Sequence, residues 1–353
     1  MKVLFTICSN NYLAQALVLA ASAKKFEPSW KFILGLVDAK ADNIPYASFG
    51  FDVLEIAVIE PDVDKLAEKY SIVELNTCVK PTYASWFFDK LGATEVVYMD
   101  PDTCLFQPMT GLDDHFETAD ILLTPHVLTP VPLDGRSLGE NLFLNYGLYN
   151  LGFLAMKRSG ETDRFLGWWK ERTYSSGHNK PAIGLYTDQL WINLVPVYFQ
   201  RVALIRHPGY NMGPWNLHER TLLPPEGNFR LDSGVPLVFY HFSGFRPAKG
   251  GSAGQMLNSD EALYQMQHRG DLYPLYQAYK DKLMAADHPF YSSQPCHYAA
   301  FHDRLMARQE QLRQIAEREA LPPFHKRCIR KIRRILHAQW NKISFHPAKK
   351  LSA

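Results

Sequence analysis

Residues 1–125 alternate short runs of β-branched and aromatic residues with stretches whose apolar side chains recur at helical spacing. This alternation predicts an α/β fold, with a mostly parallel sheet and crossover helices. Ligands of such open sheets bind beyond the carboxyl ends of the strands, so functional residues are expected just after Ile7, Val37 and Met99. The predicted strands are Val3–Ile7, Phe32–Val37, Val53–Ile59, Val96–Met99 and Ile121–Thr124, and the predicted helices are Tyr12–Phe26 and Thr82–Leu91.

The pattern changes twice farther along the chain. Residues 126–145 contain Pro, Gly and Leu without periodicity and are predicted to form a long loop, a kind of segment that tends to be functional in compact domains. After Gly250 the composition becomes helical, so we divide the chain into a ligand-binding domain, 1–250, and a helical C-terminal extension, 251–353. The later predicted elements are strands at Leu148–Met156 and Pro236–Tyr240 and helices at 161–173, 187–195, Glu261–Met284 and Ala299–Ala320.

The overall composition is that of a globular protein, because 46% of the 353 residues are hydrophobic and 21% are charged. The first apolar run ends at Cys8 and is too short for a secretory signal, and no run of roughly 18 apolar residues predicts a membrane span. The five cysteines are widely spaced and form no C-x-x-C pair, which favours a reducing compartment. We therefore expect a cytoplasmic protein.

The last part of the chain differs in charge from the rest. Residues 320–353 contain nine Lys or Arg and no acid, whereas all 36 acids lie in residues 1–319. Ile329, Ile332, Leu336 and Trp340 recur at helical spacing among these basic residues, which predicts a basic amphipathic helix suited to the inner, anionic face of a membrane. The alternative is a solvated helix that docks on the acidic remainder of the chain. That acidic remainder argues against nucleic acid as a partner.

Two carboxylates directly follow a predicted buried strand, in the segment Val96–Met99, Asp100, Pro101, Asp102. Residues i and i+2 of an extended segment point to the same side, so both acids can face one cation. Oxygen ligands suit Mg²⁺ or Mn²⁺. A second D-x-D, at Asp62 and Asp64, follows no strand and is interpreted as a solvated helix start. A turn with an Asp on each side of a Pro is the alternative for the first motif.

The segment His241-Phe242-Ser243-Gly244-Phe245-Arg246-Pro247, which follows the predicted strand ending at Tyr240, resembles a second motif. Together with the D-x-D, it is similar to the H-x-x-G-x-x-K-P pattern of the retaining glycosyltransferases of the glycogenin and bacterial lipopolysaccharide galactosyltransferase family, whose catalytic domain has the glycosyltransferase-A fold. The resemblance covers about residues 1–250 and implies a nucleotide-sugar-binding catalytic domain there.

The resemblance implies roles for these residues. Asp100, Asp102 and His241 would hold the metal, Mn²⁺ or Mg²⁺, and a set of two oxygens and one imidazole nitrogen favours Mn²⁺ somewhat. Arg246, where the family has Lys, would meet the donor phosphates with a planar guanidinium. Gly244 would let the backbone approach the diphosphate. For an isolated His, a strand-end residue beside a turn is the alternative interpretation.

Four further segments resemble the family, at residues 149–156, 187–193, 9–12 and 80–85. Tyr149–Met156 looks like its F-N-[AS]-G-V strand and Thr187–Asn193 like its D-Q-x-x-[LIF]-N helix start, so Asn150, Gly152, Asp188 and Gln189 are expected to line the sugar pocket. A strand-edge Asn150 and a helix-capping Asp188 are the alternatives. Ser9 stands where the family has an Asp, and Ser85 where Arg is usual. The expected donor-binding set is Ile7, Ser9, Asn11, Tyr12, Lys80, Asp100, Pro101, Asn150, Gly152, Gly244 and Arg246.

The resemblance implies a metal-dependent glycosyltransferase of polysaccharide biosynthesis that moves a hexose from a nucleotide diphosphate sugar, UDP-hexose, to a saccharide or lipid-linked acceptor. Retention of configuration follows from the resemblance alone. Gln189 would steady an oxocarbenium-like transition state, with Asp188 as the alternative catalytic carboxylate. Two rival interpretations stay open. One is a glycosyltransferase relative without activity, and the other is a haloacid-dehalogenase-like phosphatase, in which Cys104 occupies the position of an expected Thr or Val.

Overall fold

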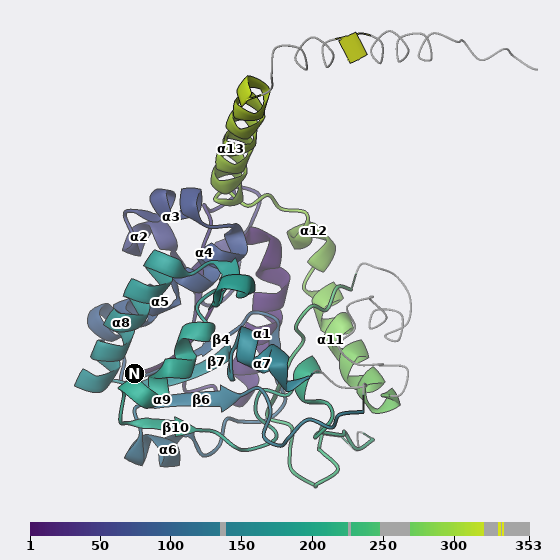
Figure 1. Ribbon diagram of the computed structural model, residues 1–353. Coiled ribbons are helices and arrows are strands. Elements are labelled where there is room, and N and C mark those ends of the chain that lie inside the picture. Colours follow the sequence, from purple (N-terminus) through teal and green to yellow (C-terminus); the bar gives the residue numbers. More distant parts are fainter. Residues whose placement is uncertain (135–138, 225–226, 248–268, 321–330, 333, 335–353) are drawn as a thin grey trace, which may run out of the picture. The chain divides into compact units, whose positions relative to one another are not determined.

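The computed structural model describes residues 1–134, 139–224, 227–247, 269–320, 331–332 and 334 (Figure 1). The chain forms two compact units, Met1–His302 and Asp303–Ala353. The boundary predicted at residue 250 lies outside the described residues. So does most of the predicted basic helix, of which Lys331, Ile332 and Arg334 are described and are helical. Among the described helices, none combines the length and the apolar character needed to cross a membrane.

The first unit is built on a seven-stranded sheet with the order β10-β6-β7-β4-β1-β2-β3. Strand β7 is antiparallel to both β4 and β6, and all the other neighbours are parallel. This confirms the predicted fold class, a mixed and mostly parallel sheet flanked by helices, as expected for the glycosyltransferase-A fold. The strands are β1 (Lys2–Cys8), β2 (Lys31–Leu36), β3 (Asp52–Glu55), β4 (Glu95–Met99), β6 (Ile121–Pro125), β7 (Tyr149–Lys157) and β10 (Val202–Leu204).

Apolar residues on both faces of the strands account for the layers on either side of the sheet. In β1, Val3, Phe5 and Ile7 belong to one core cluster, which includes residues of α4 (Ile72–Cys78), α5 (Lys80–Leu91) and α8 (Gly160–Ser176). Leu4 points to the opposite face and packs in a cluster with α1 (Leu13–Phe26) and α6 (Leu112–Thr118). Figure 1 shows α5 and α8 on one side of the sheet and α1 on the other.

A short antiparallel ribbon lies outside the main sheet. It pairs β5 (Thr103–Leu105) with β11 (Phe239–His241), and the partner of His241 in this register is Thr103. A two-stranded ribbon is marginal by itself. Here Cys104 and Tyr240 belong to a core cluster that also contains residues of α1 and of α11 (Tyr273–Ala285), so the ribbon is held between these helices.

The remaining elements are short. Another two-stranded ribbon pairs β8 (Asn179–Lys180) with β9 (Leu185–Tyr186). The helix α13 (Ala299–Ala320) has the predicted bounds, and from Asp303 onward it belongs to the second unit. The other described helices are α2 (Ile56–Ile59), α3 (Val63–Lys69), α7 (Glu140–Tyr146), α9 (Val195–Tyr198) and α12 (His288–Ser292), with 3₁₀ turns at Asn10–Tyr12, Tyr46–Ser48, Pro181–Ile183, Leu190–Leu194, Pro214–Asn216 and Gly270–Leu272.

Several predicted elements are wrong in part. The strand predicted at Val53–Ile59 ends at Glu55, and its second half is the helix α2, because a short apolar run does not distinguish a strand from a buried helix. The helix predicted at 187–195 begins instead with Thr187 in the left-handed region (φ 46°), followed by a 3₁₀ turn. The predicted loop 126–145 contains α7. Of the helix predicted at Glu261–Met284, the described part begins at Arg269 and consists of the 3₁₀ turn Gly270–Leu272 followed by α11.

Candidate metal and donor site

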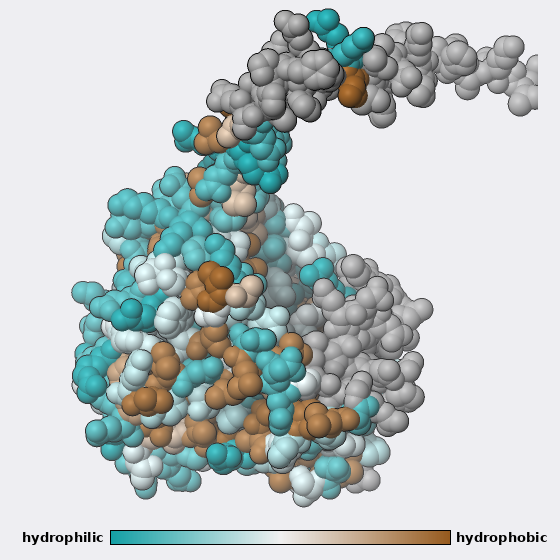
Figure 2. Space-filling model, viewed as in Figure 1, coloured by the Kyte–Doolittle hydropathy of each residue, from teal (hydrophilic) through white to brown (hydrophobic). Residues whose placement is uncertain are grey.

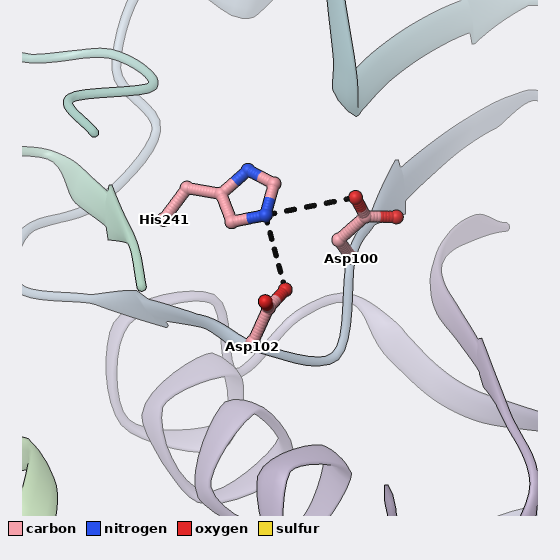
Figure 3. A group of neighbouring side chains, drawn as sticks. All are labelled: Asp100, Asp102 and His241. Atoms are coloured by element: carbon pink, nitrogen blue, oxygen red, sulfur yellow. Dashed lines mark ion pairs between the residues drawn. The ribbon is translucent and has the colours of Figure 1, made fainter. Parts of the chain in front are cut away.

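Asp100, Asp102 and His241 converge at the carboxyl end of β4, as the sequence predicts (Figure 3). Nε2 of His241 lies 3.0 Å from Oδ1 of Asp102 and 3.7 Å from Oδ2 of Asp100. One ligand atom from each residue lies within 4.8 Å of the others. Separations of this size, in a set of two carboxylate oxygens and one imidazole nitrogen, fit a single divalent cation such as Mn²⁺ or Mg²⁺.

Local backbone structure fixes these three side chains. Asp100 follows the last residue of β4, and its carbonyl accepts hydrogen bonds from the backbone N–H (3.1 Å) and the hydroxyl (2.7 Å) of Thr103, which closes the turn around the buried Pro101. The N–H of Phe242 donates to the carbonyl of Asp102 at 2.8 Å. Asp100 and Asp102 directly precede β5, and His241 ends β11. The pairing of these two strands therefore brings the backbones of the acids and the histidine together.

Gly152 of β7 leaves room for the imidazole. A Cβ atom added to Gly152 would lie 2.3 Å from Nδ1 of His241, a distance that no side chain tolerates. The ring is also packed edge-on against Trp215, with 5.1 Å between the ring centroids. Nδ1 of His241 is buried without a hydrogen-bond partner among the described residues, so steric packing rather than hydrogen bonding directs Nε2 toward the acids.

The two acids also control the charge of the ring. Burial by itself lowers the pKa of His241, but the carboxylates of Asp102 and Asp100 outweigh burial and raise the pKa above its ordinary value. Without a cation, the imidazole of His241 therefore tends to stay protonated beside the two acids. A cation bound at the same place would take over the charge-neutralising role of that proton.

Lys80 joins this cluster to a third carboxylate. Its buried ammonium lies 3.1 Å from Oδ2 of Asp188 and 3.5 Å from Oδ1 of Asp100, and it donates to the carbonyl of Leu151 at 3.1 Å. It also lies 4.4 Å from the ring centroid of Tyr98, whose hydroxyl donates to Asp100. Asp188 is only 1% exposed, and burial raises its pKa while Lys80 lowers it. Asp188 is therefore an internal ion-pair partner, and the alternative interpretation as a helix cap is wrong.

Asn150 and Gln189 are both held by backbone groups. Oδ1 of Asn150 accepts from the N–H of Gly152 at 2.9 Å, and its amide nitrogen lies 3.1 Å from Nε2 of His126. Asn150 is the second residue of β7, which lies inside the sheet. Oε1 of Gln189 accepts from the N–H of Leu151 at 3.0 Å, and its Nε2 donates to the carbonyl of Tyr146 at 2.8 Å. These contacts fix the orientation of the Gln189 amide.

The loop after β1 contains the predicted nucleotide-binding residues. Ile7 packs in the core, and the hydroxyl of Ser9 is buried, donating to the carbonyl of Val37 at 3.1 Å and accepting from the amide of Asn76 at 3.1 Å. Asn11 is half-buried, and Tyr12 is 36% exposed. Burial raises the pKa of Tyr12, and the charges of Asp102 and Asp100 raise it further.

The segment after β11 is less enclosed. Gly244 adopts a positive φ of 75°, which a glycine accommodates without strain, and no atom of the described residues lies within 4 Å of the position of an added Cβ. Arg246 is exposed, and its charge opposes that of Asp102 in setting the pKa of Tyr12.

A buried polar group behind the site was not predicted from the sequence. Asn211 is fully buried, with its amide donating to the hydroxyl of Thr124 at 2.7 Å and to Oδ1 of Asn150 at 3.1 Å. Burial lowers the pKa of His126 to about 4, so its ring is neutral, and Trp215 packs edge-on against it. The density of Gly, Asn and aromatic residues at 209–216 is the signal that could have located this group.

The second D-x-D does not join the site. The carboxylate of Asp62 pairs with the exposed ammonium of Lys65 at 2.7 Å, at the start of α3. In the described part of the chain, the cluster of Asp100, Asp102 and His241 is the one group of three acidic, His or Cys residues close enough to hold a metal ion.

No protein-family model matches the chain. Two proteins of Bacillus subtilis resemble it in sequence: the uncharacterized protein YfnF, 26% identical over 245 residues, which cover 68% of this chain and 80% of YfnF, and the uncharacterized protein YfnD, 23% identical over 251 residues, which cover 68% of this chain and 76% of YfnD.

Similar solved structures are glycosyltransferases. The galactosyltransferase LgtC, solved with donor and acceptor sugar analogues, has a TM-score of 0.46 at 15% identity, covering 81% of this chain and 96% of LgtC. The glycosyltransferase GlyE of Streptococcus pneumoniae has a TM-score of 0.45 at 14% identity, covering 88% of this chain and 65% of GlyE. Mouse xyloside xylosyltransferase 1 has a TM-score of 0.41 at 12% identity, covering 69% of this chain and 98% of the enzyme.

Proposed function

We propose that the chain is a metal-dependent glycosyltransferase that moves a hexose from a nucleotide diphosphate sugar, with UDP-hexose as donor, to a saccharide or lipid-linked acceptor. The observation that carries this proposal is the convergence of Asp100, Asp102 and His241 at the carboxyl edge of the sheet. A divalent cation held there would neutralise the charge that develops on the diphosphate as it leaves. An imidazole beside two carboxylates favours Mn²⁺ over Mg²⁺ as this cation.

The residues around the cluster suit the two ends of such a donor. On the β7 side, Asn150, Asp188 and Lys80 form a fixed polar wall that would contact sugar hydroxyls, which is where one sugar is distinguished from its epimer. On the β1 side, Tyr12 and Arg246 would meet the nucleoside and the phosphates. The wall is rigid because each of its side chains is already bonded to the backbone or to a partner.

Transfer with retention of configuration belongs to the same proposal. Inversion requires a carboxylate free to act as a base opposite the leaving group. Asp100 and Asp102 face the cation position, and Asp188 is paired with Lys80, so none of the three is free for that task. The Gln189 amide, held between the backbones of Leu151 and Tyr146, would steady positive charge at the sugar. The anomeric proton signal of the product tests this assignment, and an inverted product would refute it.

Calorimetric titration of UDP into the full-length protein tests the function directly. With Mn²⁺ present we expect binding, and with EDTA in place of Mn²⁺ we expect the binding to disappear. A screen of nucleotide sugars, read by product mass, then identifies the donor. UDP binding with no turnover of any donor would leave a binding protein without activity. Absence of metal-dependent UDP binding would refute the proposal, and hydrolysis of a phosphate monoester would favour the phosphatase interpretation.

The cellular setting is also a proposal. Four cysteines of the described chain, Cys8, Cys78, Cys104 and Cys296, are free thiols, as a reducing cytoplasm requires. The basic amphipathic segment at residues 326–340 would bring the enzyme to the inner face of a membrane, where lipid-linked precursors of polysaccharides are assembled. A peripheral location of this kind suits the lipid-linked class of acceptor.

A further inference from the structure

Asp38, the second residue after β2, is only 1% exposed. Within the described chain, no cationic side chain is bonded to its carboxylate. Its partners are three backbone N–H groups. Oδ2 accepts from Asn10 at 3.0 Å, and Oδ1 accepts from Ala39 at 3.0 Å and from His297 at 2.7 Å. One side chain thus joins three segments that are far apart in the sequence.

The first of these segments is the loop after β1. Besides the backbone bond to Asp38, the side chain of Asn10 donates to the carbonyl of Ala39 at 2.9 Å and accepts from the hydroxyl of Tyr46. The N–H of Tyr12 donates back to the carbonyl of Ser9 at 2.9 Å. Hydrogen bonds therefore hold the Ser9–Tyr12 loop to the segment after β2, and one of them is accepted by the carboxylate of Asp38.

The third segment follows α12, in the part of the chain that carries no recognised motif. His297 offers its backbone N–H to Asp38, and Gln294 accepts a hydrogen bond from the amide of Asn43 at 3.1 Å. The thiol of Cys296 lies against the hydroxyl of Ser9 and the backbone N–H of Asn11. Residues 294–297 thus contact both the loop after β1 and the segment after β2.

The sheet order determines which part of a donor reaches this place. The cation position lies at the end of β4, and the polar wall of Asn150 and Asp188 lies toward β7. On the other side of β4 come β1 and then β2, whose ends carry the Ser9–Tyr12 loop and Asp38. A donor whose diphosphate binds at the cation and whose sugar points toward β7 would extend its nucleoside over β1 and β2.

The burial of Asp38 is costly, because desolvation raises its pKa even though the three N–H groups and His297 lower it. We propose that Asp38 is a positioning residue for the nucleoside half of the donor, whose carboxylate clamps the Ser9–Tyr12 loop between residues 37–39 and 294–297. This inference rests on the proposed function. According to this proposal, residues 294–297, which lie outside the recognised motifs, belong to the donor site.

The variant Asp38→Asn tests the clamp. An amide offers one acceptor oxygen where the carboxylate offers two, so either Asn10 or His297 must face an NH₂ group instead of an oxygen. We expect UDP with Mn²⁺ to bind about tenfold or more weakly to this variant, as for a lost hydrogen bond to a charged group. Inorganic pyrophosphate with Mn²⁺, which lacks the nucleoside, should bind within about twofold of wild type. Asp42→Asn, on the same loop and exposed, is the matched control and should change neither affinity.

Equal weakening of UDP and pyrophosphate, or no weakening of UDP, would overturn the clamp. If Asp38→Asn does not fold, the pair His297→Pro and His297→Ala replaces it. Proline removes the N–H that Asp38 accepts, whereas alanine removes only the exposed side chain, so the clamp predicts selective loss of UDP affinity for proline alone. A wild-type protein that binds pyrophosphate and UDP equally well with Mn²⁺ would refute the clamp but keep the metal site. One that binds neither would refute the proposed function as well.

Discussion

Gly152 and His241 approach so closely that a single methyl group on Gly152 would lie 2.3 Å from Nδ1 of the imidazole. We therefore expect Gly152→Ala to displace the ring from the acids and to abolish the stabilisation that Mn²⁺ gives in thermal unfolding. Gly167→Ala is the matched control, because an added Cβ there meets no atom within 4 Å and replaces a helical glycine, which should stabilise α8 by up to about 1 kcal/mol. Retention of the Mn²⁺ shift in Gly152→Ala would contradict the packing argument.

The two D-x-D segments give a second matched pair. Asp102→Asn replaces a ligand at the cation position and should reduce Mn²⁺ affinity by at least about tenfold, measured by calorimetry. Asp62→Asn removes an exposed ion pair with Lys65 and should change stability by less than about 0.5 kcal/mol without affecting Mn²⁺. If both variants lose Mn²⁺ affinity to the same extent, the metal site is not at Asp102.

Loss of Lys80 is expected to be strongly destabilising. Lys80→Met leaves the carboxylate of Asp188 buried without its cation, which should cost about 3–5 kcal/mol in the free energy of unfolding. The double variant Lys80→Met/Asp188→Asn removes both charges and should recover a large part of that loss. Urea unfolding of the two single variants and the double variant measures the coupling, and additive losses would show that the pair is not a unit.

The pH dependence of metal binding follows from His241. Its pKa in the folded protein is raised above 6.5, so without metal the protonated ring contributes stability that is fully present below pH 6.5 and is lost as the pH rises through the raised pKa. Mn²⁺ must displace that proton, so the increase in melting temperature caused by Mn²⁺ should grow over the same pH range. A shift that falls as the pH rises through this range would contradict the assignment of His241 as a ligand.

The basic tail predicts binding to anionic membranes. The full-length chain should sediment with vesicles that contain anionic lipid, less so at high salt, and a chain ending near Pro322 should not. Vesicles of neutral lipid serve as the control. Equal sedimentation of the two proteins would refute the membrane proposal and favour a tail that docks on the acidic remainder of the chain.

Six strands of the sheet could be predicted from their short apolar runs, whereas β10, which consists of three half-buried residues, was not predicted. The same information located Asp100 and Asp102, since it distinguished a D-x-D after a strand from the one before α3. The ion pair between Lys80 and Asp188 could not be predicted. It forms between segments that are distant in sequence, and local patterns around Asp188 indicate only a helix cap.

Local patterns also failed where tertiary contacts determine the backbone. Thr187 adopts a left-handed conformation that its own sequence does not favour, and the apolar run Ile56–Ile59 forms a helix after only a short strand. The three-residue strand β5 is too short to detect, although its pairing with β11 is what brings His241 to the acids. The sequence motifs thus predicted that Asp100, Asp102 and His241 lie together, and the structure shows that the pairing of β5 with β11 brings them together.

The pairing of Thr103 with His241 joins the backbones of the candidate ligands directly, although they are far apart in the sequence. Part of the intervening chain, Gly152 of β7 and Trp215, packs against the imidazole and is therefore constrained together with it. Insertions or exchanges confined to peripheral elements such as the ribbon of β8 and β9 should leave the relative positions of Asp100, Asp102 and His241 unchanged.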